Sequence, residues 1–131
     1  MLQIARKILI IDDEAYVLSL LSSKFRQVGD DVLTAVDGQE GLEIARRESP
    51  HLIISDYQMP VLNGLDLAQR LKADPTTARI PVLMLTARGH RLEADDVSRT
   101  NIRCVLPKPF STRELLSKVE QLVGAPQRCA L

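Results

Sequence analysis

The sequence lacks an excess of charge of either sign. Its 131 residues include 17 Lys or Arg and 17 Asp or Glu, so the formal net charge is +0 at pH 7. A general nucleic-acid binder or a protein of the membrane surface would have a basic field. This composition excludes such a field, so we expect no direct nucleic-acid binding and a function that comes from local sites.

Long apolar runs are also missing near the start of the chain. The longest covers residues 8–11, which is far short of a membrane span. Asp12 and Asp13 follow it directly, where a secretory leader would have a cleavage site. We therefore expect a cytoplasmic protein without membrane insertion.

Cysteines are few. Cys104 and Cys129 are the only two, a predicted helix separates them, and neither has a His partner at the spacing of a metal site. Disulfide frameworks and zinc sites need more such residues. We expect two reduced and unreactive thiols.

Repeats, low-complexity segments and internal linkers are absent from the sequence. A chain of this length is long enough for one core and too short for two ordinary domains. We predict one domain at residues 1–124 and a flexible tail at residues 125–131.

Five short apolar runs are present, and each has the length of a β-strand. They lie at residues 7–11, 32–36, 52–55, 82–85 and 104–106. Runs such as ILII and LII do not alternate apolar with polar residues, which is typical of strands buried on both faces. This pattern favours a parallel sheet covered by helices on both sides.

Helical patterns separate the runs, and several have start or stop signals. Asp37 followed by Glu40, and Ser111 followed by Glu114, have the spacing of capping boxes that begin helices. Stop signals follow the first, third and fifth patterns, at Gly29-Asp30, Asp74-Pro75 and Gly124. We predict a helix after each strand.

The fourth helical pattern is the weakest. Across residues 91–99 only Leu92, Ala94 and Val97 could face a sheet. This helix therefore gains the least from packing, and we expect it to be the most mobile.

Strand and helix alternate five times, which predicts right-handed crossovers and a doubly wound α/β fold. Periodicity does not give the strand order. Pro107, however, cannot donate to a neighbouring strand, so the fifth strand is expected at an edge of the sheet. We predict the flavodoxin-like order 2-1-3-4-5, a five-stranded parallel sheet with five helices on two faces.

Chemically active side chains follow the predicted strands. Asp12-Asp13 follow the first, Asp56 the third, Thr86 the fourth and Lys108 the fifth. The ligand crevice of an open α/β sheet lies beyond these carboxyl ends. An Asp at a strand end is often only a helix cap or turn former, but three converging carboxylates repel one another unless a cation lies among them.

The residue types suit phosphoryl transfer. Oxygen ligands without His or Cys select Mg²⁺, which binds one or two carboxylates and a phosphate oxygen. Lys108 and Thr86 would supply donors to the transferring group. One carboxylate can then act as nucleophile and form an acyl phosphate.

Four motifs make a resemblance plain: ILIIDDE at residues 8–14, LIISDYQMPVLNG at 52–64, VLMLTA at 82–87 and Lys108-Pro109-Phe110. Across residues 7–123 the sequence resembles the response-regulator receiver domains of two-component signalling, of the chemotaxis-regulator type. The resemblance implies a phosphorylatable switch that catalyses only its own phosphorylation and dephosphorylation.

The resemblance also implies roles for individual residues. Asp56 would be the phosphoacceptor, and Asp13, Asp56 and the backbone carbonyl of Gln58 would coordinate Mg²⁺, assisted by Asp12 mostly through water. Other contacts are implied as follows: Lys108 pairs with the phosphoryl oxygens, Thr86 hydrogen-bonds to them in the active state, the Ala87 N–H adds a contact, and the Lys108-Pro109 peptide is cis.

One position departs from the family. Many receivers have Tyr or Phe three residues before the site lysine, and here that residue is Val105. A valine has no ring to rotate and its χ1 is stiff. We therefore hypothesise that Thr86 instead repositions residues 87–90 and that the fourth helix shifts or partly melts.

Two further residues near the site are open to interpretation. Gln58 and Arg88 occupy the positions that, in the family, flank the phosphoryl group and set its rate of hydrolysis. Arg88 either shields the acyl phosphate or points into solvent. His90 is expected to be an ordinary surface histidine.

The implied partners are a sensor histidine kinase or a His-containing phosphotransfer domain as donor, and an unknown protein that recognises the face from the fourth to the fifth helix. We expect a stand-alone receiver that is a monomer or a weak dimer. The main alternative is a fragment of a longer regulator or hybrid kinase without its output domain. An Mg²⁺-dependent phosphatase with an Asp nucleophile, a receiver that is not phosphorylated and a flavin carrier are disfavoured.

Overall fold

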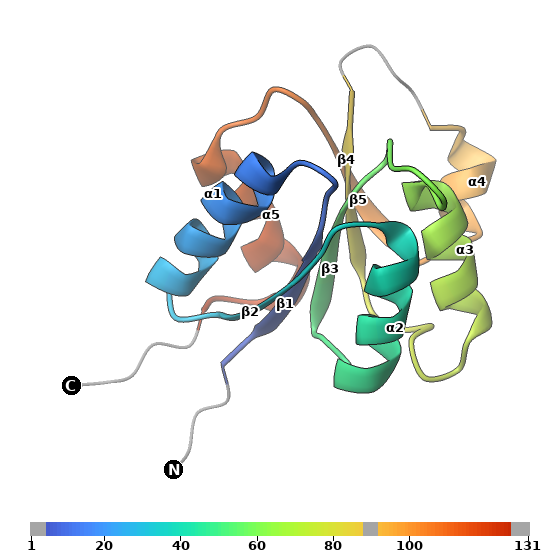
Figure 1. The fold of residues 1–131 in the computed structure, drawn as a ribbon, viewed down its shortest axis with the longest axis horizontal. Helices are drawn as coiled ribbons and strands as arrows, with labels where there is room; N and C mark the ends of the chain where they lie inside the picture. The colour runs from blue at the N-terminus through green and yellow to red at the C-terminus, as the bar shows by residue number, and fades with distance from the viewer. Residues whose placement is uncertain (1–4, 88–91, 127–131) are drawn as a thin grey trace.

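The computed structural model describes residues 5–87 and 92–126, so the expectations for Arg88, His90, Cys129 and most of the tail lie outside the described residues. Within them five strands alternate with five helices (Figure 1). Their bounds are β1 Lys7–Ile11, α1 Ala15–Gln27, β2 Asp31–Ala35, α2 Gly38–Glu48, β3 Leu52–Asp56, α3 Gly64–Ala73, β4 Val82–Thr86, α4 Ala94–Ser98, β5 Ile102–Pro107 and α5 Thr112–Val123.

The strands form one parallel sheet in the order β2-β1-β3-β4-β5. This confirms the predicted fold class and strand order. Pro107 is the last residue of β5, at the edge of the sheet, as its missing N–H requires.

Helices cover both faces of the sheet. In Figure 1, α1 and α5 lie on one side and α2, α3 and α4 on the other. Alternate residues of β1 enter the two cores: Ile8 and Ile10 pack against α1 and α5, whereas Leu9 and Ile11 belong to the core beneath α2 and α3. The unbroken ILII run is therefore explained by burial on both faces.

The sequence located four strands to within about one residue, but it underestimated β5. That strand begins at Ile102 rather than at Cys104. Arg103 is polar and exposed, which hid the start of the strand. An edge strand tolerates such a residue because it is less covered than the strands inside the sheet.

The two predicted helix starts are confirmed. The Asp37 side chain accepts a hydrogen bond from the Glu40 N–H at 2.8 Å, and the Ser111 hydroxyl accepts one from the Glu114 N–H at 3.0 Å. The Glu40 carboxylate, in turn, accepts the N–H of Val36 at 2.9 Å. These bonds satisfy backbone donors that a helix start leaves without partners.

The fourth helix is thinly packed, as expected, but within the described residues it is shorter than the pattern at residues 91–99. It spans Ala94–Ser98, and none of its residues is buried. Val97 and the preceding Leu92 are only partly buried against the core. Its greater mobility stays a prediction.

No helix in the described part of the chain has the length and hydropathy needed to cross a membrane.

A buried ion pair joins distant parts of the chain. The Arg6 guanidinium donates two hydrogen bonds to the Asp30 carboxylate, at 2.7 and 2.6 Å, and a third to the Gly124 carbonyl at 2.7 Å. Both side chains are almost fully buried. The pair therefore fixes the start of β1, the turn before β2 and the end of α5 to one another.

Asp30→Asn should lower the free energy of unfolding by about 3–5 kcal/mol, because it leaves the Arg6 guanidinium buried without its counter-charge. Urea unfolding at neutral pH measures this. Arg46→Gln is the matched control, since it removes the exposed Arg46–Asp74 pair and should change stability little. Equal losses in the two variants would contradict a dominant role for the buried pair.

Candidate functional site

The predicted site residues come together at the carboxyl ends of the strands. Asp12 and Asp13 follow β1, Asp56 ends β3, and Lys108 follows β5. Hydrogen-bonded pairing of β1 with β3, and of β3 with β4 and β4 with β5, places these ends side by side. The parallel topology alone therefore gathers residues that are up to about a hundred positions apart in sequence.

Three carboxylates form the acidic half of the site. Asp12, Asp13 and Asp56 each offer an oxygen, and these oxygens lie within 4.8 Å of one another. Asp12 and Asp56 are buried, whereas Asp13 is exposed. One side of the cluster is therefore open to water and the other is closed.

Lys108 supplies the positive charge. Its Nζ lies 3.3 Å from Asp56 Oδ1, 3.6 Å from Asp12 Oδ2 and 3.9 Å from Glu14 Oε1. Sequence reasoning gave Glu14 no role. Its position directly after Asp13 could have indicated a place in the site, because consecutive residues that follow β1 stay near the carboxyl end of that strand.

Burial sets the protonation of the two inner carboxyls. Burial raises the pKa of Asp12, and the neighbouring Asp56 raises it further against a hydrogen bond from the Glu14 N–H. Burial also raises the pKa of Asp56, an effect that the Lys108 ammonium reduces without reversing. Both carboxylates are therefore less stable as anions than free Asp, and an added cation would stabilise them.

Lys108 responds in the opposite way. Burial lowers its pKa, but the attraction of Asp12 and Asp56 outweighs this effect and the pKa rises. The ammonium group therefore stays protonated at neutral pH and remains a fixed donor for an anion at this edge.

The donor set fits a magnesium ion. Asp12 Oδ2 is buried and, within residues 5–87 and 92–126, has no hydrogen-bond partner, which leaves a lone pair for a metal or a metal-bound water. Asp13 and Asp56 offer further oxygens, and the exposure of Asp13 leaves room for water ligands. Mg²⁺ favours such oxygen ligands and retains several waters.

A hollow of about 760 Å³ lies over this cluster. It is lined by residues at or after the ends of β1, β3, β4 and β5: Asp13, Glu14, Asp56, Gln58, Ala87, Lys108 and Pro109. The predicted phosphoryl-binding residues Ala87 and Lys108 and the predicted metal ligand Gln58 therefore border one space. The Gln58 backbone also acts to lower the pKa of Asp56, against the larger effect of burial.

Thr86 does not line this hollow, although the next residue, Ala87, does. Thr86 is 1% exposed, ends β4 and stands beside Pro107 in the sheet. Its carbonyl accepts the Lys108 N–H at 2.7 Å, so the backbone of β4 holds the lysine in place. The Lys108-Pro109 peptide is cis, as the resemblance implied.

The loop after Asp56 is held close to the sheet by a glycine. A Cβ on Gly64 would lie 2.8 Å from the Asp56 carbonyl oxygen and 2.5 Å from Met84 Sδ. Gly64 is required by this close approach; positive φ is found elsewhere in the loop, at Val61. The Asn63 side chain then caps α3 by accepting the Asp66 N–H at 2.8 Å.

Val105 stands where the resemblance suggested an aromatic ring. It pairs with Met84 in the sheet and remains 38% exposed.

Comparison with known proteins agrees with this geometry. The model of the response regulator receiver domain matches residues 8–120. The "Probable chemotaxis protein CheY" of Rhizobium etli is 32% identical over 120 residues, which is 91% of this chain and 93% of that protein.

Two further proteins show the range of relatives. The DNA-binding dual master transcriptional regulator RpaA of Synechocystis is 38% identical over 93% of this chain, but the match spans only 51% of RpaA. The receiver domain of the sensor histidine kinase PA1611 of Pseudomonas aeruginosa, crystallised with magnesium in its active-site cleft, has the same fold. Its TM-score is 0.82, with 24% identity over 93% of this chain and 100% of that one.

Receiver domains bind Mg²⁺ in an acidic site, and this chain has such a cluster at the expected edge. The chain belongs to the response-regulator receiver domain family, and is thus a regulatory signalling domain of two-component systems rather than an enzyme in the ordinary sense.

Proposed function

We propose that Asp56 is the phosphoacceptor of this receiver domain. The observation that supports this choice is its position: Asp56 ends the central strand β3, borders the hollow, and lies 3.3 Å from Lys108 Nζ. Asp12 is enclosed and Asp13 is exposed to solvent. Asp56 therefore combines access to a donor with a fixed cation beside it.

The reaction transfers a phosphoryl group from a phosphorylated imidazole to Asp56. An Asp56 oxygen attacks phosphorus, the new P–O bond forms as the P–N bond breaks, and the electron pair leaves with the imidazole nitrogen, which is then protonated from solvent. Lys108 balances the charge of the phosphoryl oxygens throughout. Ala87, at the edge of the hollow, offers its N–H to one of these oxygens.

Asp13, Asp56 and the Gln58 carbonyl would hold the magnesium ion, with Asp12 assisting through water. The ion, when bound, would neutralise negative charge on the phosphoryl oxygens. This arrangement is supported by the oxygens of the Asp cluster and by the place of Gln58 beside Asp56.

As a receiver domain, the chain interacts with histidine kinases or phosphotransfer partners. We propose that residues 1–124 make up this domain, that it works in the cytoplasm as a monomer or weak dimer, and that its target is a protein. The alternative is the receiver part of a longer regulator, because the chain spans only about half of RpaA. Such a regulator would have its own output domain.

We also propose how phosphorylation reaches the surface. Thr86, moving toward the phosphoryl group, would pull on the end of β4 and loosen α4, whose amides from Val97 to Thr100 donate only within the same short segment. Because Val105 has no ring to rotate, the movement of α4 would take the place of the aromatic rotation. The altered surface is that of α4, β5 and α5.

Incubation with acetyl phosphate and Mg²⁺ should add one phosphoryl group, because Asp56 borders the hollow and lies beside Lys108. Intact-mass measurement detects the adduct. Asp56→Asn should abolish it, and the control Asp66→Asn, which changes an exposed carboxylate at the start of α3, should retain it. An unchanged adduct on Asp56→Asn would refute the assignment.

Asp13→Asn should weaken Mg²⁺ binding at least about tenfold, since it removes a charged oxygen ligand. Calorimetric titration measures the affinity. Glu14→Gln is the control: it is the next residue and close to Lys108, but it lies outside the carboxylate cluster. Comparable losses in both variants would show that general charge, rather than ligation, governs binding.

Hydrogen exchange should quicken at the Val97, Arg99 and Thr100 amides when Mg²⁺ and beryllofluoride are added, because α4 has no buried residue to stabilise it. Amides of α2, which packs firmly through Leu42 and Ala45, provide the internal control. Thr86→Val should suppress the change at α4. Equal protection of α4 with and without the analogue would contradict this mechanism.

A further inference from the structure

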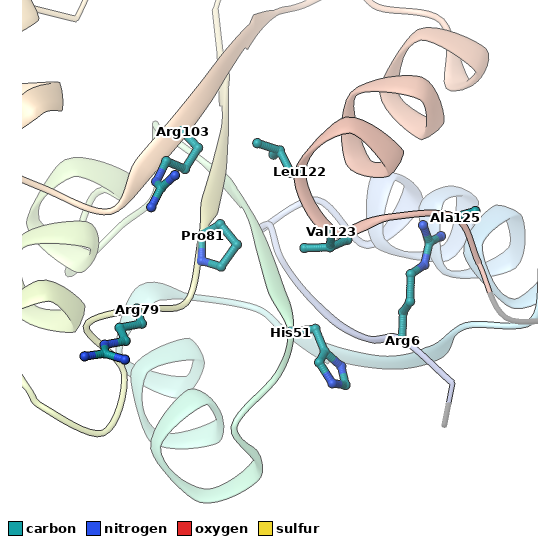
Figure 2. Close-up of a pocket in the computed structure, with 8 residues that line it drawn as sticks. All are labelled: Arg6, His51, Arg79, Pro81, Arg103, Leu122, Val123 and Ala125. Carbon is teal, nitrogen blue, oxygen red and sulfur yellow. The ribbon is translucent and has the colours of Figure 1, made fainter. Parts of the chain in front are cut away.

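A second hollow lies at the opposite end of the strands, about one strand length from Asp56. Its volume is about 470 Å³ (Figure 2). Arg6 precedes β1, His51 precedes β3, Pro81 precedes β4 and Arg103 lies near the start of β5, so the hollow is at the amino ends of the strands. The function proposed for the site around Asp56 does not involve this second hollow.

The charges around this hollow have one sign. Arg6, Arg79 and Arg103 line it together with the His51 ring, and no carboxylate does so among the residues that the structure describes. Arg6 is already bonded to Asp30 and Gly124. A concave surface with charges of one sign focuses the potential and attracts counter-ions.

Two of these arginines have no polar partner for their guanidinium groups in the part of the chain that the structure describes. Within the described ranges, neither Arg79 nor Arg103 has an ion pair or a hydrogen bond from its guanidinium. In Figure 2 they lie on either side of Pro81. The guanidinium groups of Arg79 and Arg103 each have five N–H donors, and these donors are available on either side of the Pro81 ring.

His51 adds a donor of fixed position. Its Nδ1 accepts the backbone N–H of Lys7 at 2.8 Å, so the proton of the neutral ring lies on Nε2. The ring is exposed at the border of the hollow. An anion there would find an imidazole N–H in addition to the two guanidinium groups.

The remaining wall is apolar. Pro81 and Leu122, from opposite sides, line the hollow between the charged groups. Its volume lies within the ordinary range of small-molecule sites, roughly 300–1,000 Å³. A molecule with a flat apolar body and a charged end matches such walls better than a bare ion or an extended strand.

We propose that this hollow is a binding site for a small organic phosphate, such as a nucleoside monophosphate. On binding, the Arg79 and Arg103 side chains would turn in from either side of Pro81 to reach the phosphate oxygens, to which guanidinium groups favour bidentate bonds. His51 donates a further hydrogen bond, and the base or other flat group packs against Pro81 and Leu122.

AMP is the probe, titrated into the full chain in EDTA so that divalent metal is absent from the Asp56 edge. NMR should show shifts at His51, Arg79 and Arg103, and calorimetry should give a saturable affinity. Arg103→Gln and Arg79→Gln should each weaken AMP binding at least about tenfold, as expected for charge-assisted bonds. Arg103→Lys should lose less than Arg103→Gln, since it retains the charge but not the fork.

Arg70→Gln is the matched control, because it removes an exposed arginine from α3 that does not line the hollow. It should bind AMP as the unaltered chain does, and so should Asp56→Asn. Adenosine and inorganic phosphate should each bind at least about tenfold more weakly than AMP, because each fills half of the site. No shift at the hollow with millimolar AMP, shifts confined to the Asp56 edge, or equal losses in Arg103→Gln and Arg70→Gln would overturn the proposal.

Discussion

The convergence of Asp12, Asp13 and Asp56 is the constraint on which the rest of the site depends. Their oxygens lie within 4.8 Å of one another, and two of the three carboxylates are buried. Like charges at this distance oppose folding unless cations balance them, and burial raises the pKa of both Asp12 and Asp56. Lys108 provides one such cation, and the open side next to Asp13 leaves room for another.

The fold holds this unfavourable cluster in place from outside. Apolar residues on both faces of β1, β3 and β4 fix the strand ends, and the Gly64 backbone packs directly against the carbonyl of Asp56. At the far edge, the Arg6–Asp30 pair ties the termini of the domain together. Stability gained away from the site therefore compensates for the repulsion within it.

Much of this could be predicted from the sequence, because a parallel sheet converts strand order into neighbouring strand ends. ILII before Asp12 and LIIS before Asp56 indicated both the buried strands and the residues that leave them. Features that depend on tertiary distances could not be found in this way. Examples are the approach of Glu14 to Lys108 and the lack of room for a side chain at position 64. The hollow around Arg79 and Arg103 was missed for the same reason, since nothing in their local pattern brings them together.

The region of α4 and β5 is less tightly packed than the site around Asp56. Thr86 is enclosed, but Val105 and α4 beside it are poorly covered. Under the proposed mechanism, a small movement at the end of β4 would be transmitted to α4, none of whose residues is buried, rather than into the core. A structure of the protein with Mg²⁺ and beryllofluoride tests the central claim most directly. We predict beryllium bonded to an Asp56 oxygen, the metal held by Asp13, Asp56 and the Gln58 carbonyl, and Lys108 Nζ on a fluorine; attachment to Asp12 or Asp13, or a metal bound elsewhere, would contradict the account.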